Sequence, residues 1–182
     1  MPADFKPFDK AEWLRLEKKA DELRRLTVQT TVWGGSGHIG GAMSAMDAMT
    51  ILYHRFMKLD VNNPDMEDRD RFVLSKGHAA PGLYSVLANR GYFPVEELET
   101  LRHIGSRLQG HPNMNDAPGI DMSTGSLGQG ISAAVGMALA AKHWGDGYRV
   151  YTLLGDGECE EGQVWEAAMF LSLIHISEPT RH

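Results

Sequence analysis

The chain has 182 residues, 42% of them hydrophobic and 23% charged, a composition typical of one globular domain with a buried core. Its formal net charge of -6 argues against a nucleic-acid-binding surface. The single cysteine, Cys159, excludes an internal disulfide and favours a reducing compartment, and no apolar run reaches membrane-spanning length. We therefore expect a cytoplasmic protein that binds neither nucleic acid nor a membrane.

The first predicted element is a helix from about residue 9 to residue 32. Asp9 and Glu12 have the spacing of a capping box, and apolar residues recur behind them at helical intervals. The helix leads into W-G-G-S-G-H-I-G-G at residues 33–41, where five glycines surround one serine and His38. Such a backbone can approach a ligand closely, and the alternative is a flexible turn with an exposed histidine. A second helix with a methionine-rich buried stripe is predicted to follow, as far as Phe56.

A short buried strand is predicted at residues 72–74, followed by S-K-G-H at residues 75–78 and a third helix. His78 would then lie at the beginning of a helix, where backbone N–H groups favour anions. An imidazole in that position can donate to a phosphate oxygen, or it can simply cap the helix. Gly91 is expected to end this helix, and Pro94 to begin another.

Residues 105–122 form a long loop rich in glycine, proline and asparagine, which carries His111 in the sequence Q-G-H-P-N. The sequence S-T-G-S-L-G-Q-G at residues 123–130 then opens a helix of small residues, 130–143, that we expect to pack closely against another helix or another subunit. Leu127 is an isolated large apolar residue between glycines. It is either a wedge under a flat ligand ring or a core contact.

The second predicted strand, residues 150–154, ends in G-D-G at residues 155–157. Ligands of open α/β sheets bind at the carboxyl ends of parallel strands. A carboxylate flanked by glycines suits a hard cation that bridges diphosphate oxygens, whereas the alternative is a tight turn in which Asp156 caps the next helix. An acidic cluster follows, either as a solvated face or as part of the same site, formed by Glu158, Glu160 and Glu161.

The order of these loops strongly resembles the cofactor-binding domain of transketolases, from about residue 12 to Ala168. Five separated motifs agree in sequence and order: S-G-H, D-R-F-V-L-S-K-G-H, G-H-P, G-S-L-G-Q-G and G-D-G-E-x-x-E-G. The resemblance implies an α/β thiamine diphosphate-binding fold, with a parallel sheet that has helices on both faces and is incomplete at its C-terminal end. Residues 1–170 are expected to form this partial domain, and the short chain resembles the N-terminal subunit of a split bacterial transketolase.

The resemblance implies that three histidines surround the reacting sugar and the cofactor. His38 is similar to a histidine that lines the substrate channel, and His111 to the active-site histidine near the donor hydroxyls. His78 is similar to a residue that contacts the cofactor diphosphate. A segment that holds the aminopyrimidine and thiazolium rings is implied at Gly125, Ser126 and Leu127.

The remaining implied roles concern the metal, the diphosphate and the dimer. Asp156 is similar to the ligand of Mg2+, and Gly157 to a backbone contact of the diphosphate. Glu161 and Glu166 resemble glutamates that link the two cofactor sites across the dimer interface. The implied reaction transfers a two-carbon ketol unit from a ketose (phosphate) to an aldose (phosphate) with thiamine diphosphate and Mg2+. The implied partners, in a heterotetramer, are a second N-terminal chain and the C-terminal transketolase subunit.

The chain departs from the family pattern in three places. S-G-H-I-G-G replaces the commoner S-G-H-P-G, and G-S-L-G replaces G-P-L-G, with the glycines and histidines retained. In the family an asparagine roughly thirty residues after the G-D-G aspartate completes the magnesium site, but no asparagine occurs from Gly157 to His182. Residues 171–182 do not continue the family sequence and resemble translated sequencing-adapter read-through.

An incomplete sheet would leave an exposed edge and an uncovered apolar face, so we expect this chain alone to be unstable or free of cofactor. The main alternative to an enzyme subunit is therefore a non-catalytic, truncated dimerisation module. Another alternative is a different thiamine diphosphate enzyme, 1-deoxy-xylulose-5-phosphate synthase, whose resemblance is poorer over the S-K-G-H and G-H-P loops. A zinc protein is disfavoured because no pair of histidines has the ligand spacing of a zinc-binding helix.

Overall fold

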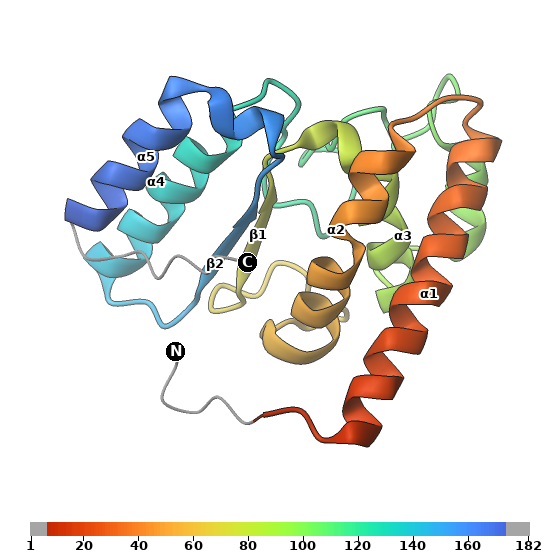
Figure 1. Ribbon diagram of the computed structural model, residues 1–182, viewed down its shortest axis with the longest axis horizontal. Coiled ribbons are helices and arrows are strands. Elements are labelled where there is room, and N and C mark those ends of the chain that lie inside the picture. The colour runs from red at the N-terminus through yellow and green to blue at the C-terminus, as the bar shows by residue number, and fades with distance from the viewer. Residues whose placement is uncertain (1–6, 174–182) are drawn as a thin grey trace.

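The computed structural model describes residues 7–173, which form a two-stranded parallel sheet with helices on both faces (Figure 1). The α/β class expected from the sequence is confirmed. In chain order the elements are α1 (Lys10–Trp33), α2 (Ile39–Ile51), the π-helix η1 (Leu52–Phe56), β1 (Arg71–Leu74), the 3-10 helix η2 (Gly77–Ala79), α3 (Ala80–Arg90), the 3-10 helix η3 (Val95–Thr100), α4 (Gln129–Trp144), β2 (Val150–Leu153), the 3-10 helix η4 (Gly157–Glu160) and α5 (Gly162–Leu173).

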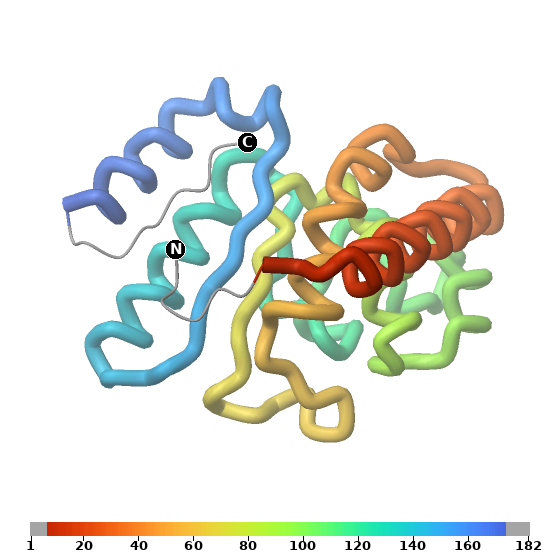
Figure 2. The backbone as a smooth tube through the Cα atoms, turned by 60° about the horizontal axis from the view of Figure 1, so that its bottom comes forward, coloured from red at the N-terminus to blue at the C-terminus, as the bar shows by residue number. Residues whose placement is uncertain are grey.

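The two strands lie between two separate groups of helices. Figures 1 and 2 show α1, α2 and α3 on one side of the strands and α4 and α5 on the other. Phe72 of β1 pairs with Tyr151 of β2, and Leu74 pairs with Leu153. All four side chains pack into the larger core with the first group of helices. Because side chains alternate along a strand, Val73 points to the opposite face.

The larger core is built mainly from helical side chains, among them Met46 and Met49 of α2, which are fully buried. The interpretation of the methionine stripe as core is therefore confirmed. The smaller core joins α4 to α5 through Ile131, Val135 and Val164. The small-residue helix α4 thus packs against another helix, as expected.

The predicted helix boundaries are confirmed where a local signal marks them. The Asp9 carboxylate accepts a hydrogen bond from the Glu12 backbone N–H at 2.7 Å and begins α1, and Gly91 ends α3 with φ of 94°. The helix expected after Pro94 is instead the short 3-10 helix η3. It cannot continue because Arg102 adopts a φ of 61° and its N–H donates to Leu108 O at 2.8 Å, which turns the chain into the long loop.

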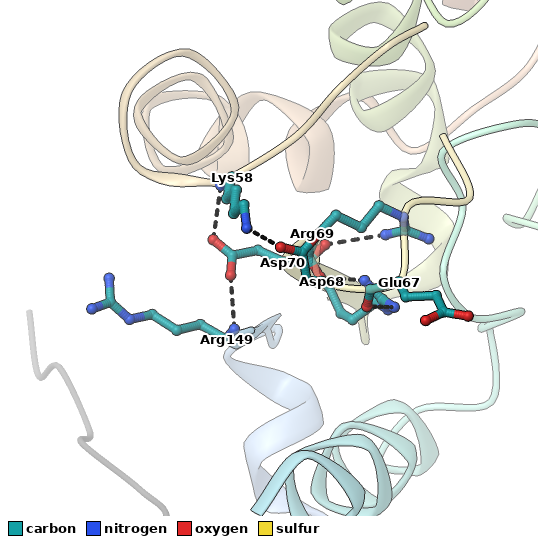
Figure 3. A network of polar contacts seen from close by, with 7 residues as sticks. Lys58, Glu67, Asp68, Arg69, Asp70 and Arg149 are labelled. Atoms are coloured by element: carbon teal, nitrogen blue, oxygen red, sulfur yellow. Dashed lines mark hydrogen bonds and ion pairs between the residues drawn. The ribbon is translucent and has the colours of Figure 1, made fainter. Parts of the chain in front are cut away.

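Two buried carboxylates fasten β1 to its surroundings. At the amino ends of the strands, Asp70 accepts hydrogen bonds from the backbone N–H groups of Lys58 at 2.8 Å and Arg149 at 2.7 Å (Figure 3). On the edge of β1 away from β2, Asp121 of the long loop accepts from Phe72 N–H at 2.7 Å. The second carboxylate therefore takes the place of a further strand along β1.

The helix expected to end at Phe56 changes to π-helical pairing at η1, where Met57 N–H donates to Leu52 O at 2.8 Å. His54 lies in this segment, and its Nε2 has no hydrogen-bond partner within residues 7–173. Burial lowers the pKa of His54 to about 4, and the positive charges of Arg90, Lys19 and Arg15 act in the same direction.

The chain is expected to lose stability as the pH falls from about 6.5 to about 4, because unfolded His54 takes up a proton that the folded imidazole does not. The folded pKa is the lower one, so the stabilisation is complete above the unfolded pKa and disappears as the pH approaches the folded pKa. Urea unfolding across this range should show a smaller loss for His54→Gln. The exposed His103→Gln variant should keep the native pH dependence, and an unchanged slope in His54→Gln would contradict the assignment.

An exposed apolar face lies on the outer helices. Trp165, Met169 and Leu173 follow one another along α5 with exposed fractions of 60%, 60% and 78%. These side chains belong to a helix and not to the sheet, so the uncovered sheet face expected from the sequence stays a prediction. Within residues 7–173, no helix is both long and apolar enough to span a membrane. Most of the segment expected to be foreign to the family, residues 174–182 of 171–182, lies outside the described residues, and α5 continues to Leu173.

Candidate functional site

Three turns converge at the carboxyl ends of the two parallel strands. They are residues 75–78 after β1, residues 124–128 before α4 and residues 155–161 after β2. The first two touch through backbone, because a Cβ added to Gly77 would lie 2.6 Å from Gly125 N. Thr124 Oγ1 also donates to Leu74 O at 2.7 Å. All the motifs after residue 70 that resemble a cofactor site therefore share one edge of the sheet.

Glu158 is the side chain that joins these turns, and its exposed fraction is only 1%. Its Oε1 accepts hydrogen bonds from Ser75 Oγ and from Gly128 N–H, the latter at 2.9 Å, and its Oε2 accepts from Gly155 N–H at 2.9 Å. In the sequence, Glu158 stands out only as one member of an acidic cluster. No spacing signal distinguishes it from its neighbour Glu160, which is exposed.

The histidines also converge at this edge. The rings of His38, which precedes α2, and His78, on η2, have centroids 5.2 Å apart in an edge-to-face arrangement. Burial lowers the pKa of His78, and electrostatic interactions with His38, Lys76 and His111 lower it further. A neutral imidazole results, which can donate one N–H to an anion and accept at its other nitrogen. His78 forms no side-chain helix cap, so the capping alternative is wrong.

The glycine-rich turn before α4 lies directly against His111. A Cβ added to Gly125, whose φ is 147°, would lie 2.8 Å from Cδ2 of the His111 ring. Ser126 and Leu127 follow on the exposed side of this turn. Leu127 is 38% exposed, so the interpretation of this residue as a core contact is wrong, and its side chain is accessible to a ligand.

The G-D-G turn leaves both of its functional candidates accessible. Asp156 and Gly157 are exposed. Asp156 occupies the N-cap position of η4, as the alternative supposed, but its carboxylate forms no capping hydrogen bond. No atom lies within 4 Å of a Cβ built on Gly157, which leaves room for a ligand against its backbone. The Asp156 carboxylate, the accessible backbone of Gly157 and the imidazole of His78 together fit a metal-bound diphosphate. Residues 7–173 contain no group of three His, Cys, Asp or Glu side chains placed to hold a metal by themselves.

The two glutamates predicted to act across a dimer are separated by the structure. Glu161 lies at the site, because its Cβ is 3.1 Å from the position that a Cβ added to Gly128 would take. Glu166 is exposed on α5 beside the apolar Trp165 and Met169, and within the described part of the chain it makes no hydrogen bond to a site residue. Its position suits a contact outside this chain better than a contact within it.

Lys76 is a second site residue that the sequence alone did not single out. It directly precedes η2 and is only 6% exposed, although it is a lysine in a turn. Burial lowers the pKa of Lys76, and the negative charges of Asp156 and Glu158 oppose that change. Its Nζ donates to Ser44 Oγ of α2 at 3.0 Å. The buried Lys76 ammonium therefore lies at the same edge of the sheet as Asp156.

Comparison with known proteins gives a consistent family. Residues 16–178 match the family described as transketolase, thiamine diphosphate binding domain. The chain is 52% identical over 155 residues to the 6-deoxy-6-sulfo-D-fructose transketolase subunit SqwG of Clostridium sp. (strain MSTE9). This alignment covers 85% of this chain and 56% of that protein. It is 46% identical over 177 residues to human transketolase, in an alignment that covers 97% of this chain and 28% of that protein.

A further bacterial relative and a solved structure agree with this result. The chain is 43% identical over 154 residues to an apulose-4-phosphate transketolase subunit from Phocaeicola vulgatus, in an alignment that covers 85% of this chain and 54% of that protein. Transketolase from Leishmania mexicana superimposes with a TM-score of 0.83 at 36% identity, over 85% of this chain and 25% of that one. The chain thus spans about half the length of its subunit relatives. These matches show that the chain belongs to the transketolase family, within its thiamine diphosphate-binding domain.

Proposed function

We propose that this chain is the N-terminal, diphosphate-binding part of a transketolase that transfers a two-carbon ketol unit from a ketose (phosphate) to an aldose (phosphate). The observation that carries the proposal is the convergence of His38, His78 and His111 with the G-D-G turn at one edge of the sheet. A diphosphate needs cations and N–H donors, whereas sugar hydroxyls need groups that exchange protons near neutral pH. Both kinds of group are present at this edge.

The cofactor would be held by residues from all three turns. Asp156 would bind Mg2+ through its exposed carboxylate, and His78 with the backbone of Gly157 would contact the diphosphate. Gly125, Ser126 and Leu127 would contact the rings, since this turn exposes both backbone and an apolar side chain. Thiamine diphosphate supplies, when bound, the carbanion chemistry that moves a two-carbon unit.

The other histidines would act on the sugar. His38 and His111 are exposed, both interact electrostatically with His78, and both can donate protons to substrate hydroxyls or accept protons from them. The substrate class follows from the subunit relatives, whose names refer to 6-deoxy-6-sulfo-D-fructose and apulose-4-phosphate. We propose an anionic sugar of this kind, with the pentose phosphates as the default substrates of the family.

The active enzyme would need further chains. The exposed apolar face of α5 and the outward position of Glu166 support two partners in a heterotetramer, a second N-terminal chain and the C-terminal transketolase subunit. A location in the cytoplasm remains a prediction. The second candidate function is a non-catalytic dimerisation module, for which the exposed apolar face of α5 is the supporting observation.

Thermal unfolding of the purified chain, with and without thiamine diphosphate and Mg2+, tests the proposal. Ligand at about 100 times its Kd should raise Tm by roughly 5–10 °C, since it binds only the folded state. Asp156→Ala should abolish this shift. Asp146→Ala, an exposed aspartate before the amino end of β2, should retain it. A chain with no shift would be the interaction module instead.

A further inference from the structure

Lys76 differs from the other buried charged side chains in its hydrogen bonding. In residues 7–173 the buried charged side chains are Asp70, Lys76, Asp121 and Glu158. Each carboxylate is held by at least two donors or by one donor and a guanidinium. Among the described residues, the Lys76 ammonium, which has three N–H donors, makes one hydrogen bond, to the neutral hydroxyl of Ser44.

No described carboxylate neutralises Lys76 by direct contact. Asp156 and Glu158 attract it, but within residues 7–173 neither forms an ion pair with it at 4.0 Å or less. The Glu158 carboxylate is already occupied by Ser75, Gly128 and Gly155. A buried ammonium left in this condition is costly, and an anionic oxygen beside it removes most of that cost.

The path of the Lys76 side chain leads to the candidate cofactor site. Its Cβ and Cδ lie against Gly155, each 3.6 Å from the position a Cβ would take there, so the stem runs beside the G-D-G turn. Its Nζ reaches Ser44 in the second turn of α2, and the ring of His78 lies over Gly41 in the first turn of that helix. The ammonium therefore lies close enough to both Asp156 and His78 to interact with them electrostatically, on the side of the sheet edge where an anion would bind.

We propose that Lys76 binds the diphosphate group of thiamine diphosphate directly, through a charge-assisted hydrogen bond from its ammonium to a phosphoryl oxygen. The inference rests on the proposed cofactor site and adds a residue to it. It also explains why a lysine occupies a turn with only 6% exposure: the bound anion is its missing partner. Without ligand, the charge of Lys76 contributes nothing to folding or opposes it.

The test measures ligand affinity and ligand-free stability on the same variants of the 182-residue chain. Lys76→Met keeps the apolar stem and removes the charge, and Lys76→Gln is the polar variant for the case that the methionine variant does not fold. Lys18→Met on the exposed face of α1 makes the same charge change away from the site. Calorimetric titrations use thiamine diphosphate and inorganic pyrophosphate with Mg2+, and thiamine without phosphate as the ligand control.

The expected result is a loss of affinity for thiamine diphosphate and pyrophosphate by about 10- to 100-fold in the Lys76 variants, the effect of one hydrogen bond to a charged group. The ligand-free Tm should stay the same or rise, and Lys18→Met should match the native chain in every titration. Thiamine should show no difference between any of the variants.

Other outcomes separate the two proposals. Two results would overturn the assignment of Lys76 and leave the proposed function standing. The first is native affinity for thiamine diphosphate in both Lys76 variants. The second is a lower ligand-free Tm in both variants, which is the result expected if Lys76 has only a structural role. Lys76-dependent binding of pyrophosphate without any binding of thiamine diphosphate would support the anion contact and reject the cofactor function of this chain. A native chain that binds neither ligand would overturn both proposals.

Discussion

Replacing Asp121 with alanine is expected to lower the free energy of unfolding by about 3–5 kcal/mol, the usual cost of breaking a buried ion pair. Asp121 is 8% exposed, and its Oδ1 lies 2.5 Å from Nη1 of Arg69 while its Oδ2 accepts the Phe72 N–H. The alanine variant would leave the Arg69 guanidinium without its counter-ion. It would also leave one N–H on the edge of β1 without an acceptor.

Asp121→Asn should be milder than Asp121→Ala. Burial raises the pKa of Asp121, and the attraction of Arg69 only partly opposes it, so the charge itself adds little to stability. The asparagine carbonyl can still accept from Phe72. The control is Asp68→Ala, since Asp68 pairs with Lys58 on the surface, where both side chains are 60% exposed and water screens their attraction.

Urea unfolding followed by circular dichroism measures all three variants. The expected order of stability is native and Asp68→Ala, then Asp121→Asn, then Asp121→Ala. An Asp121→Ala variant as stable as Asp68→Ala would show that the long loop does not close the edge of β1 in solution.

The second large effect is expected at Glu158. Glu158→Ala removes the acceptor of three donors from three segments, Ser75, Gly128 and Gly155. Each donor left buried without a partner costs about 1–3 kcal/mol, so a loss of roughly 4 kcal/mol or more is expected. Because these segments carry the candidate cofactor contacts, the thermal response to thiamine diphosphate and Mg2+ should disappear as well.

The matched control is Glu160→Ala in the same 3-10 helix, where the side chain is exposed. This variant should stay within about 0.5 kcal/mol of the native chain, the usual range for surface substitutions. Glu158→Gln should also be harmful, since its amide would present N–H groups to one of the N–H or O–H donors. If Glu158→Ala and Glu160→Ala unfold at the same urea concentration, the link between the three turns is absent in solution.

Local sequence was sufficient wherever a few neighbouring residues determine the outcome. Asp9 begins α1 and Gly91 ends α3. β1 ends directly before S-K-G-H, and β2 ends one residue before G-D-G. The order of the motifs was enough to recognise the family, because five loops agreeing in sequence leave few alternatives. In each case the signal and its effect lie within a few residues of each other.

The residues that hold the site together depend on distant partners, so only the tertiary structure identified them. Glu158 and Glu160 look alike in the sequence, but Glu158 is buried because Ser75 and Gly128 come to meet it. Lys76 is buried by Gly155 and α2, and Asp121 takes a place beside Phe72 that a further strand would fill. Burial of a charge depends on which donors, acceptors and cations the whole fold places around it. The spacing of residues along the chain does not predict that arrangement.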